Sequence, residues 1–133
     1  MKIEEQVLSR EQMAHLVELG VDTSDASMVW NCCDNKWYLL INNELTQGIV
    51  RVMKGAVSCL VPTYTIGDLI EKLPKEVDDN RLEICLADKT IGYVHFGVCA
   101  YHEDYDNLID GLYDCLCWVA ENHKELLKES NNV

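Results

Sequence analysis

Carboxylates at regular spacing near the C-terminus are the side chains with the clearest chemical potential. Asp106, Asp110 and Asp114 follow one another at intervals of four residues, which places like charges on one face of a helix. Each such pair destabilises an isolated helix by about 0.2–0.5 kcal/mol, so the pattern carries a cost. The predicted interaction face comprises these three residues together with Trp118, Glu121 and Glu125.

Three chemistries fit such a face: docking of a basic partner protein, mimicry of nucleic-acid charge, and binding of Mg²⁺ or Ca²⁺. A cation site also needs loop or backbone oxygens, and the sequence has no EF-hand spacing, so we predict no metal. A plain solvated face is the simplest alternative. Trp118 lies at the border of this face, where it either anchors an interface or packs in the core.

Aromatic side chains in the predicted sheet suggest a second kind of site. A cleft lined by aromatic rings binds small molecules, and this is the alternative function. The predicted ligand-binding residues are Trp30, Trp37, Tyr38 and Tyr93.

An enzyme is the third possibility, with Cys99 as nucleophile, His102 as base and Glu103 as the group that orients it. Known phosphate-binding, dinucleotide-binding, zinc-protease and nucleophile-elbow signatures are absent from the sequence. Surface or packing histidines are the simpler interpretation. We therefore predict no catalytic residue and no cofactor, and the enzyme is the least favoured hypothesis.

Charge and composition restrict the class of protein. The chain has 133 residues, 23 acidic and 11 basic side chains, and a formal net charge of −12. This balance argues against binding to nucleic acid or to anionic lipid, both of which need clustered Lys and Arg. The length predicts a single domain over residues 1–133.

Cysteines and the N-terminus indicate a compartment. Seven cysteines, an odd number, follow an N-terminus without the apolar stretch of a signal peptide. No apolar run reaches the roughly 18 residues that cross a bilayer. We therefore expect a cytoplasmic protein with reduced thiols.

Two short helices carry capping signals at their N-termini. Ser9 with Gln12, and Thr65 with Asp68, form capping boxes that predict helices over 9–19 and 65–73. Gly20 suits the left-handed position after the first helix, and Pro74 stops the second. A third, longer amphipathic helix is predicted over 105–127 from apolar residues at about 100° per residue, with a frayed tail over 128–133.

The remaining pattern favours strands. Alternating, aromatic and branched residues predict strands at 28–30, 36–42, 49–53, 81–87 and 91–98, and residues 43–62 are the hardest to interpret. The predicted fold class is α+β: a mainly antiparallel sheet of four to six strands packed by two short helices and the long C-terminal helix. Formation of a homodimer, through a sheet edge or the apolar flank of that helix, stays open.

Three segments carry a family resemblance: LSREQMAHLVELGVDTSDASMVW, PTYTIGDLIEKLPKEV and LIDGLYDCLCWVAEN. The chain resembles short uncharacterised proteins encoded by phages and mobile elements of gut Bacteroides-type bacteria. The resemblance covers about half of the chain and implies a bacterial or phage origin, without any site residues. With the acidity, it favours an accessory factor that binds a partner protein with a basic surface and modulates it.

Overall fold

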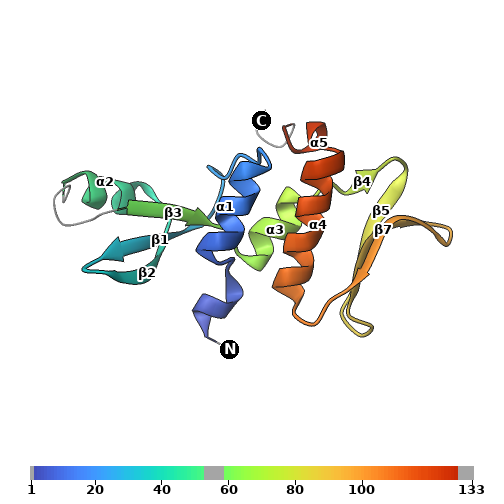
Figure 1. Ribbon diagram of the computed structural model, residues 1–133, viewed down its shortest axis with the longest axis horizontal. Helices are drawn as coiled ribbons and strands as arrows, with labels where there is room; N and C mark the ends of the chain where they lie inside the picture. The colour runs from blue at the N-terminus through green and yellow to red at the C-terminus, as the bar shows by residue number, and fades with distance from the viewer. Residues whose placement is uncertain (1, 53–58, 129–133) are drawn as a thin grey trace.

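A computed structural model describes residues 2–52 and 59–128 of the chain. It is an α+β fold with two antiparallel sheets, which confirms the predicted fold class. Figure 1 shows a layer of three helices between a small sheet at one end of the molecule and a larger sheet at the other. The helices of this layer are α1 (Arg10–Glu18), α3 (Ile66–Lys72) and α4 (Leu108–Asn122).

The first sheet has three strands in the order β2-β1-β3, where one sheet was expected for the whole protein. Its strands are β1 (Met28–Cys33), β2 (Lys36–Ile41) and β3 (Cys59–Thr63). The turn from β1 to β2 uses Asp34 and Asn35, both at positive φ, because this turn geometry matches the twist of a hairpin.

The second sheet is a meander in the order β4-β5-β6-β7. Its strands are β4 (Glu76–Val77), β5 (Asn80–Cys85), β6 (Thr90–His95) and β7 (Val98–Asp104). Between Tyr93 and Val94 the register with β7 shifts by one residue, a β-bulge. Helix α4 covers one face of this sheet, and the other face carries no helix in the described part of the chain (Figure 1).

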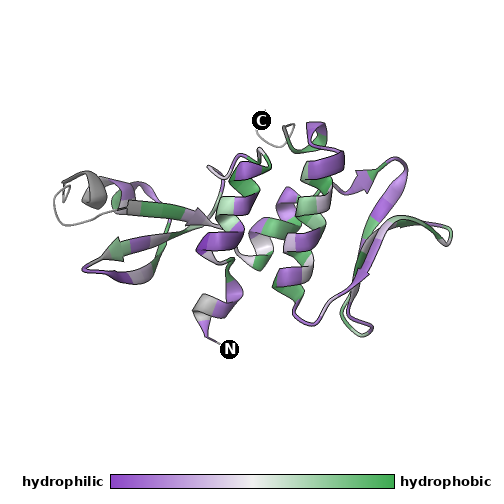
Figure 2. Ribbon diagram, viewed as in Figure 1, coloured by the Kyte–Doolittle hydropathy of each residue, from purple (hydrophilic) through white to green (hydrophobic). Residues whose placement is uncertain are grey.

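The core lies between the helical layer and the second sheet. Apolar and polar residues alternate along α1 and α4, as Figure 2 shows by hydropathy, and the apolar sides face this core. Its largest fully buried side chains in the helices and in β6 are Met13, Leu16, Leu69, Ile91, Tyr93, Leu112 and Leu116. The first sheet contributes Val61, which packs against the edge of this cluster.

Both predicted capping boxes are confirmed. Ser9 Oγ accepts a hydrogen bond from the backbone N–H of Gln12, and Gln12 Oε1 accepts one from the N–H of Ser9. Thr65 and Asp68 make the same reciprocal pair at the start of α3. These bonds satisfy N–H groups that a helix leaves unpaired in its first turn, so each helix begins where its cap stands.

The prediction of a strand over 49–53 was wrong. Residues 44–52 form α2 (Glu44–Val52), and residue 53 lies outside the described residues. Asn43 starts this helix, because its Oδ1 accepts a hydrogen bond from the N–H of Thr46 at 2.9 Å. The branched residues that suggested a strand are also spaced as the apolar side of a helix.

The long helix is shorter than predicted. It begins at Leu108, because Asn107 caps it through a bond from the N–H of Ile109 to Asn107 Oδ1. The helix ends at Asn122, and a separate short helix, α5 (Glu125–Lys128), follows. Of the predicted frayed tail, Lys128 closes α5 and residues 129–133 lie outside the described residues.

A short 3₁₀ helix, η1 (Ile3–Gln6), completes the described elements and precedes a bridge between Val7 and Thr65. Among the described helices, none is both long and apolar enough to span a membrane.

Candidate functional site

Three exposed carboxylates from two elements form what we call the acidic ridge: Glu103 on β7 with Asp110 and Asp114 on α4. Asp110 and Asp114 are one helical turn apart, and Glu103 comes alongside because β7 packs against α4. Asp110 Oδ1 accepts a hydrogen bond of 3.0 Å from Gln12 Nε2, which ties the ridge to α1. In the described part of the chain, no lysine or arginine forms an ion pair with these carboxylates.

Electrostatics within the ridge are unfavourable. Partial burial raises the pKa of Asp114, and the negative charges of Asp110 and Glu103 raise it further. A like-charge cluster of this kind costs folding free energy. It also presents a negative surface that a cation on a partner would neutralise.

The other acidic residues of the predicted face lie on different elements. Asp106 precedes α4, Glu121 lies on its last turn, and Glu125 begins α5 beyond the break at His123. All three are exposed. Because the helix is interrupted, the predicted interaction face is not one continuous helix face from Asp106 to Glu125.

Trp118 is half-buried and packs against the second sheet. Its ring lies 5.9 Å from that of Tyr93, 5.1 Å from that of Tyr101 and 5.2 Å from that of His123, measured between centroids. These aromatic contacts hold α4 on β6 and β7. The surroundings of Trp118 are therefore those of a packing residue.

The four predicted ligand-binding aromatics belong to two sheets. Trp30, Trp37 and Tyr38 lie in the first sheet, whereas Tyr93 is buried in the second and donates to the carbonyl oxygen of Pro74 at 2.8 Å. Trp30 Nε1 donates to the carbonyl oxygen of Leu8 at 3.1 Å. The structure therefore does not bring the four rings together.

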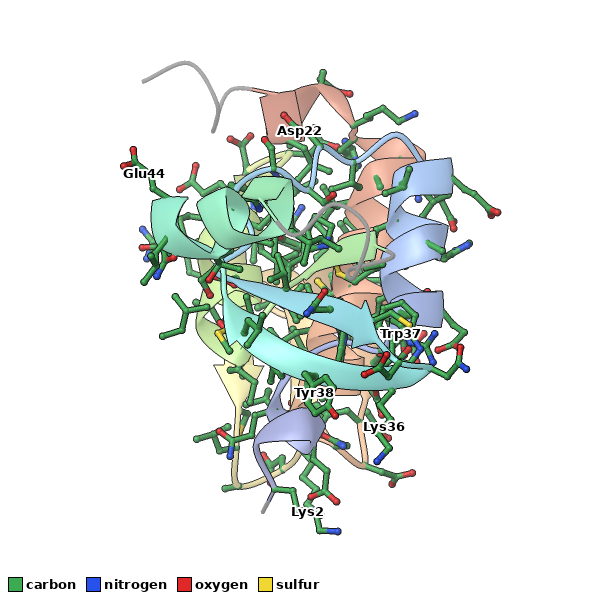
Figure 3. All side chains as sticks on the ribbon, turned by 90° about the vertical axis from the view of Figure 1, so that its left-hand side faces the viewer. Lys2, Asp22, Lys36, Trp37, Tyr38 and Glu44 are labelled. Carbon is green, nitrogen blue, oxygen red and sulfur yellow. The ribbon has the colours of Figure 1, made fainter. Side chains whose placement is uncertain are left out.

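Trp37 borders an apolar groove between α1 and the first sheet. The groove has a volume of about 200 Å³, and the Arg10 guanidinium lies 4.0 Å above the Trp37 ring. Figure 3 shows Trp37 at the end of β2 nearest α1. The groove is lined by Arg10, Met13, Ala14, Val17, Thr23, Trp37, Val61 and Pro62.

The proposed cysteine, histidine and glutamate of an enzyme all lie on β7. The β-bulge puts Cys99 and His102 on the same exposed face of the sheet, whereas Glu103 points to the face covered by α4. No hydrogen bond joins Cys99 to His102 in the described residues, and Glu103 faces away from both. This arrangement lacks the aligned triad of a nucleophilic site.

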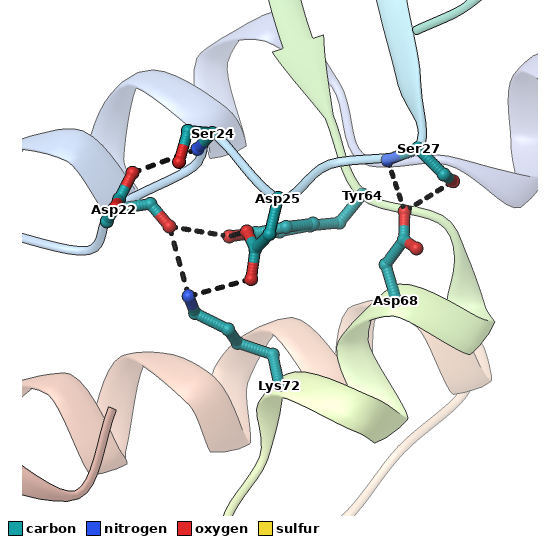
Figure 4. Close-up of polar contacts among 7 residues, drawn as sticks. All are labelled: Asp22, Ser24, Asp25, Ser27, Tyr64, Asp68 and Lys72. Atoms are coloured by element: carbon teal, nitrogen blue, oxygen red, sulfur yellow. Dashed lines mark hydrogen bonds and ion pairs between the residues drawn. The ribbon is translucent and has the colours of Figure 1, made fainter. Parts of the chain in front are cut away.

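A polar network around Asp25 was not predicted from the sequence. Lys72 on α3 donates to Asp25 Oδ2 at 2.9 Å and to the carbonyl oxygen of Asp22 at 3.1 Å, and its side chain is 1% exposed. The Tyr64 hydroxyl lies 2.6 Å from Asp25 Oδ1 (Figure 4). Burial and this hydrogen bond raise the pKa of Tyr64, so the group stays a neutral donor.

The network anchors the segment from Asp22 to Ser27 on α3. Asp68 Oδ2 accepts from the N–H and the hydroxyl of Ser27, at 3.0 and 2.7 Å, in addition to capping its own helix (Figure 4). A hollow of about 420 Å³ opens beside Lys72. Because the ammonium of Lys72 and the phenol of Tyr64 both donate to the Asp25 carboxylate, the arrangement is that of a structural clamp.

The described residues contain no group of three or more histidine, cysteine or acidic side chains placed to hold a metal ion. Glu103 was missing from the predicted interaction face, because the last predicted strand ended at residue 98 and β7 was not predicted. Comparisons with known protein families, curated proteins and solved structures find no match for this chain.

Proposed function

We propose that the protein is an acidic interaction or accessory protein that binds a partner with a basic surface through the acidic ridge. The observation that carries this proposal is the convergence of Glu103, Asp110 and Asp114 from two elements without a compensating cation in the described residues. Burial and, after it, repulsion from Asp110 and Glu103 raise the pKa of Asp114. A docked lysine or arginine relieves the repulsive part, so partner binding recovers some of the free energy that the like charges cost the folded chain.

The experiment compares two double variants with the same change of net charge. Asp110→Lys/Asp114→Lys reverses the ridge, and Glu76→Lys/Glu83→Lys reverses exposed positions on the second sheet. Tagged wild-type protein and both variants are used to purify partners from the cells that produce the protein. Each partner is then purified, and its affinity is measured by calorimetry at two salt concentrations.

We expect a partner that loses at least about tenfold in affinity with the ridge variant and much less with the control variant. Its affinity for the wild type should fall as salt rises, because exposed charges are screened. Equal loss with both variants would indicate general charge attraction and contradict the proposal. Failure to recover a specific partner would contradict it too.

A small-molecule function has one observation in its favour, the apolar groove beside Trp37. Its volume of about 200 Å³ is below the roughly 300–1,000 Å³ usual for ligand pockets. Small-molecule binding is therefore the second candidate.

A further inference from the structure

The turn between β6 and β7 exposes the single phenylalanine of the chain. Phe96 has φ +47° and is 93% exposed, and Gly97 follows at φ +81°. A left-handed backbone costs most side chains about 1–2 kcal/mol, which Asn and Asp avoid in part through local hydrogen bonds. The matching turns of this chain use that chemistry, with Asp34-Asn35 and Asp78-Asp79. The Phe96 ring contacts the ring of its neighbour His95, with 4.3 Å between centroids, and is otherwise exposed to solvent.

The hairpin tip projects from the end of the second sheet, at the extreme right of Figure 1. Val98, just after the turn, is 68% exposed, so the tip presents two apolar side chains to solvent. Beside Phe96 lies a hollow of about 660 Å³ on the open face of the sheet. Three carboxylates line it, those of Glu76, Asp79 and Glu83, with Arg81 as their one cation among its lining residues.

The groove between α1 and the first sheet complements the hairpin tip in shape and charge. Its lining is mostly apolar, and Val17 on its rim is 58% exposed. A volume of about 200 Å³ suits one aromatic ring. Arg10 adds a positive charge at the rim, held over Trp37.

From this match of shape and charge, we infer that Phe96 of one copy inserts into the α1 groove of a second copy. Arg10 of the receiving copy then faces the carboxylates beside the inserted tip. Because the tip lies at one end of the molecule and the groove beside α1 in the helical layer, the two surfaces are distinct, so the contact is head-to-tail and can repeat (Figure 1). The copies therefore associate into open chains that grow with concentration.

Sedimentation velocity of the purified chain tests this inference. The protein concentration is varied from about 10 μM to about 1 mM. A buffer of about 0.15 M salt limits the range of repulsion between the acidic copies to about 8 Å. Phe96→Asn removes the ring and suits the left-handed backbone. Val17→Glu introduces a charge into the apolar lining of the groove at an exposed position, and Ala14→Glu does the same at a second lining residue. Leu86→Ser, at an apolar position 68% exposed in another turn, is the matched control.

We expect wild type and Leu86→Ser to sediment faster with rising concentration, and Phe96→Asn and both groove variants to associate at least about tenfold more weakly. An equimolar mixture of Phe96→Asn with Val17→Glu should form dimers only, because one variant keeps its groove and the other its ring. A wild type that stays monomeric, unchanged association of Phe96→Asn, or a mixture without dimers would each overturn the inference. Circular dichroism confirms that each variant is folded.

Discussion

The ammonium of Lys72 lies 2.9 Å from Oδ2 of Asp25, with the lysine side chain 1% exposed and the aspartate side chain 38% exposed. The two partners therefore depend on the pair unequally. Water can solvate the carboxylate when the lysine is removed. The buried ammonium, in contrast, would keep only the carbonyl oxygen of Asp22 among the acceptors described here.

This asymmetry predicts that Asp25→Ala destabilises the fold more than Lys72→Met. We expect Asp25→Ala to lower the free energy of unfolding by about 2–3 kcal/mol, less than for a fully buried pair because Asp25 is partly exposed. Lys72→Met should cost about 1 kcal/mol or less, since methionine fills similar space without a charge. Urea unfolding measures both, with Glu83→Ala, at an exposed position in β5, as the control. A larger loss for Lys72→Met would contradict the asymmetry.

Neutralising the acidic ridge should stabilise the protein. The fold holds the pKa of Asp114 above its ordinary value of 3.8. Ionisation of this carboxyl therefore lowers the free energy of unfolding as the pH rises from 3.8 through the raised pKa of the folded state. Asp114→Asn should therefore add about 0.2–0.5 kcal/mol at pH 7 and little at a pH well below 3.8. Thermal unfolding across pH checks the sign, and a stability gain that persists at the lowest pH would argue against this cause.

Three glycines should respond differently to a methyl group. A Cβ at Gly92 would overlap the carbonyl oxygen of Tyr101, so Gly92→Ala should lower the free energy of unfolding by about 1–3 kcal/mol. At Gly111 the Cβ would lie 2.8 Å from the Cβ of Tyr105, and a similar loss is expected. Gly48, in α2, has no atom within 4 Å of that position, so Gly48→Ala should gain about 0.5–1 kcal/mol. Chemical denaturation ranks the three variants.

The strain at Phe96 should appear as a gain in stability when it is removed. Phe96→Asn should raise the free energy of unfolding by up to about 1 kcal/mol, because asparagine adopts a left-handed backbone more readily. The measurement is made at the lowest protein concentration, where copies of the chain are separate. The exposed control Leu86→Asn, at a position outside the strained turn residues, should change stability by less than about 0.5 kcal/mol. A loss of stability in Phe96→Asn would show that the ring supports the turn.

Thiol reactivity should follow burial. Burial raises the pKa of Cys115 to about 12 and that of Cys117 to about 11, so little thiolate forms at either site near neutral pH. Cys99 is exposed. N-ethylmaleimide at pH 7.5, followed by peptide mass spectrometry, should therefore modify Cys99 well before the two helical cysteines. Equal rates at the three positions would mean that α4 opens readily.

Local signals in the sequence located two of the helices well. The boxes of Ser9 with Gln12 and of Thr65 with Asp68 act within one turn, so neighbouring residues suffice to predict them. The apolar pattern predicted a strand where α2 lies, because branched residues suit either a strand or a helix. The cap at Asn43 is the local feature that favours the helix. Local reasoning is weakest where only the pattern of apolar residues is used.

The candidate sites depended more on contacts between distant segments. Asp110 and Asp114 were predicted because they neighbour each other on one helix. Glu103 joins them only through the packing of β7 on α4. The bond from Tyr64 to Asp25 spans 39 positions, and that from Lys72 to Asp25 spans 47, so spacing alone contained no signal for the clamp.

The unequal share of the two sheets in the core has a consequence for hydrogen exchange. The described strands of the first sheet contribute only Val61 to the edge of the main cluster, whereas Ile91 and Tyr93 of the second sheet lie fully inside it. Amides of β1 and β2 should therefore exchange through a partial opening that releases this sheet while α4 stays on β6. Amides of β6 should exchange only when the whole chain unfolds. The two sheets, which lie on opposite sides of α1 (Figure 1), should therefore differ in their protection from hydrogen exchange.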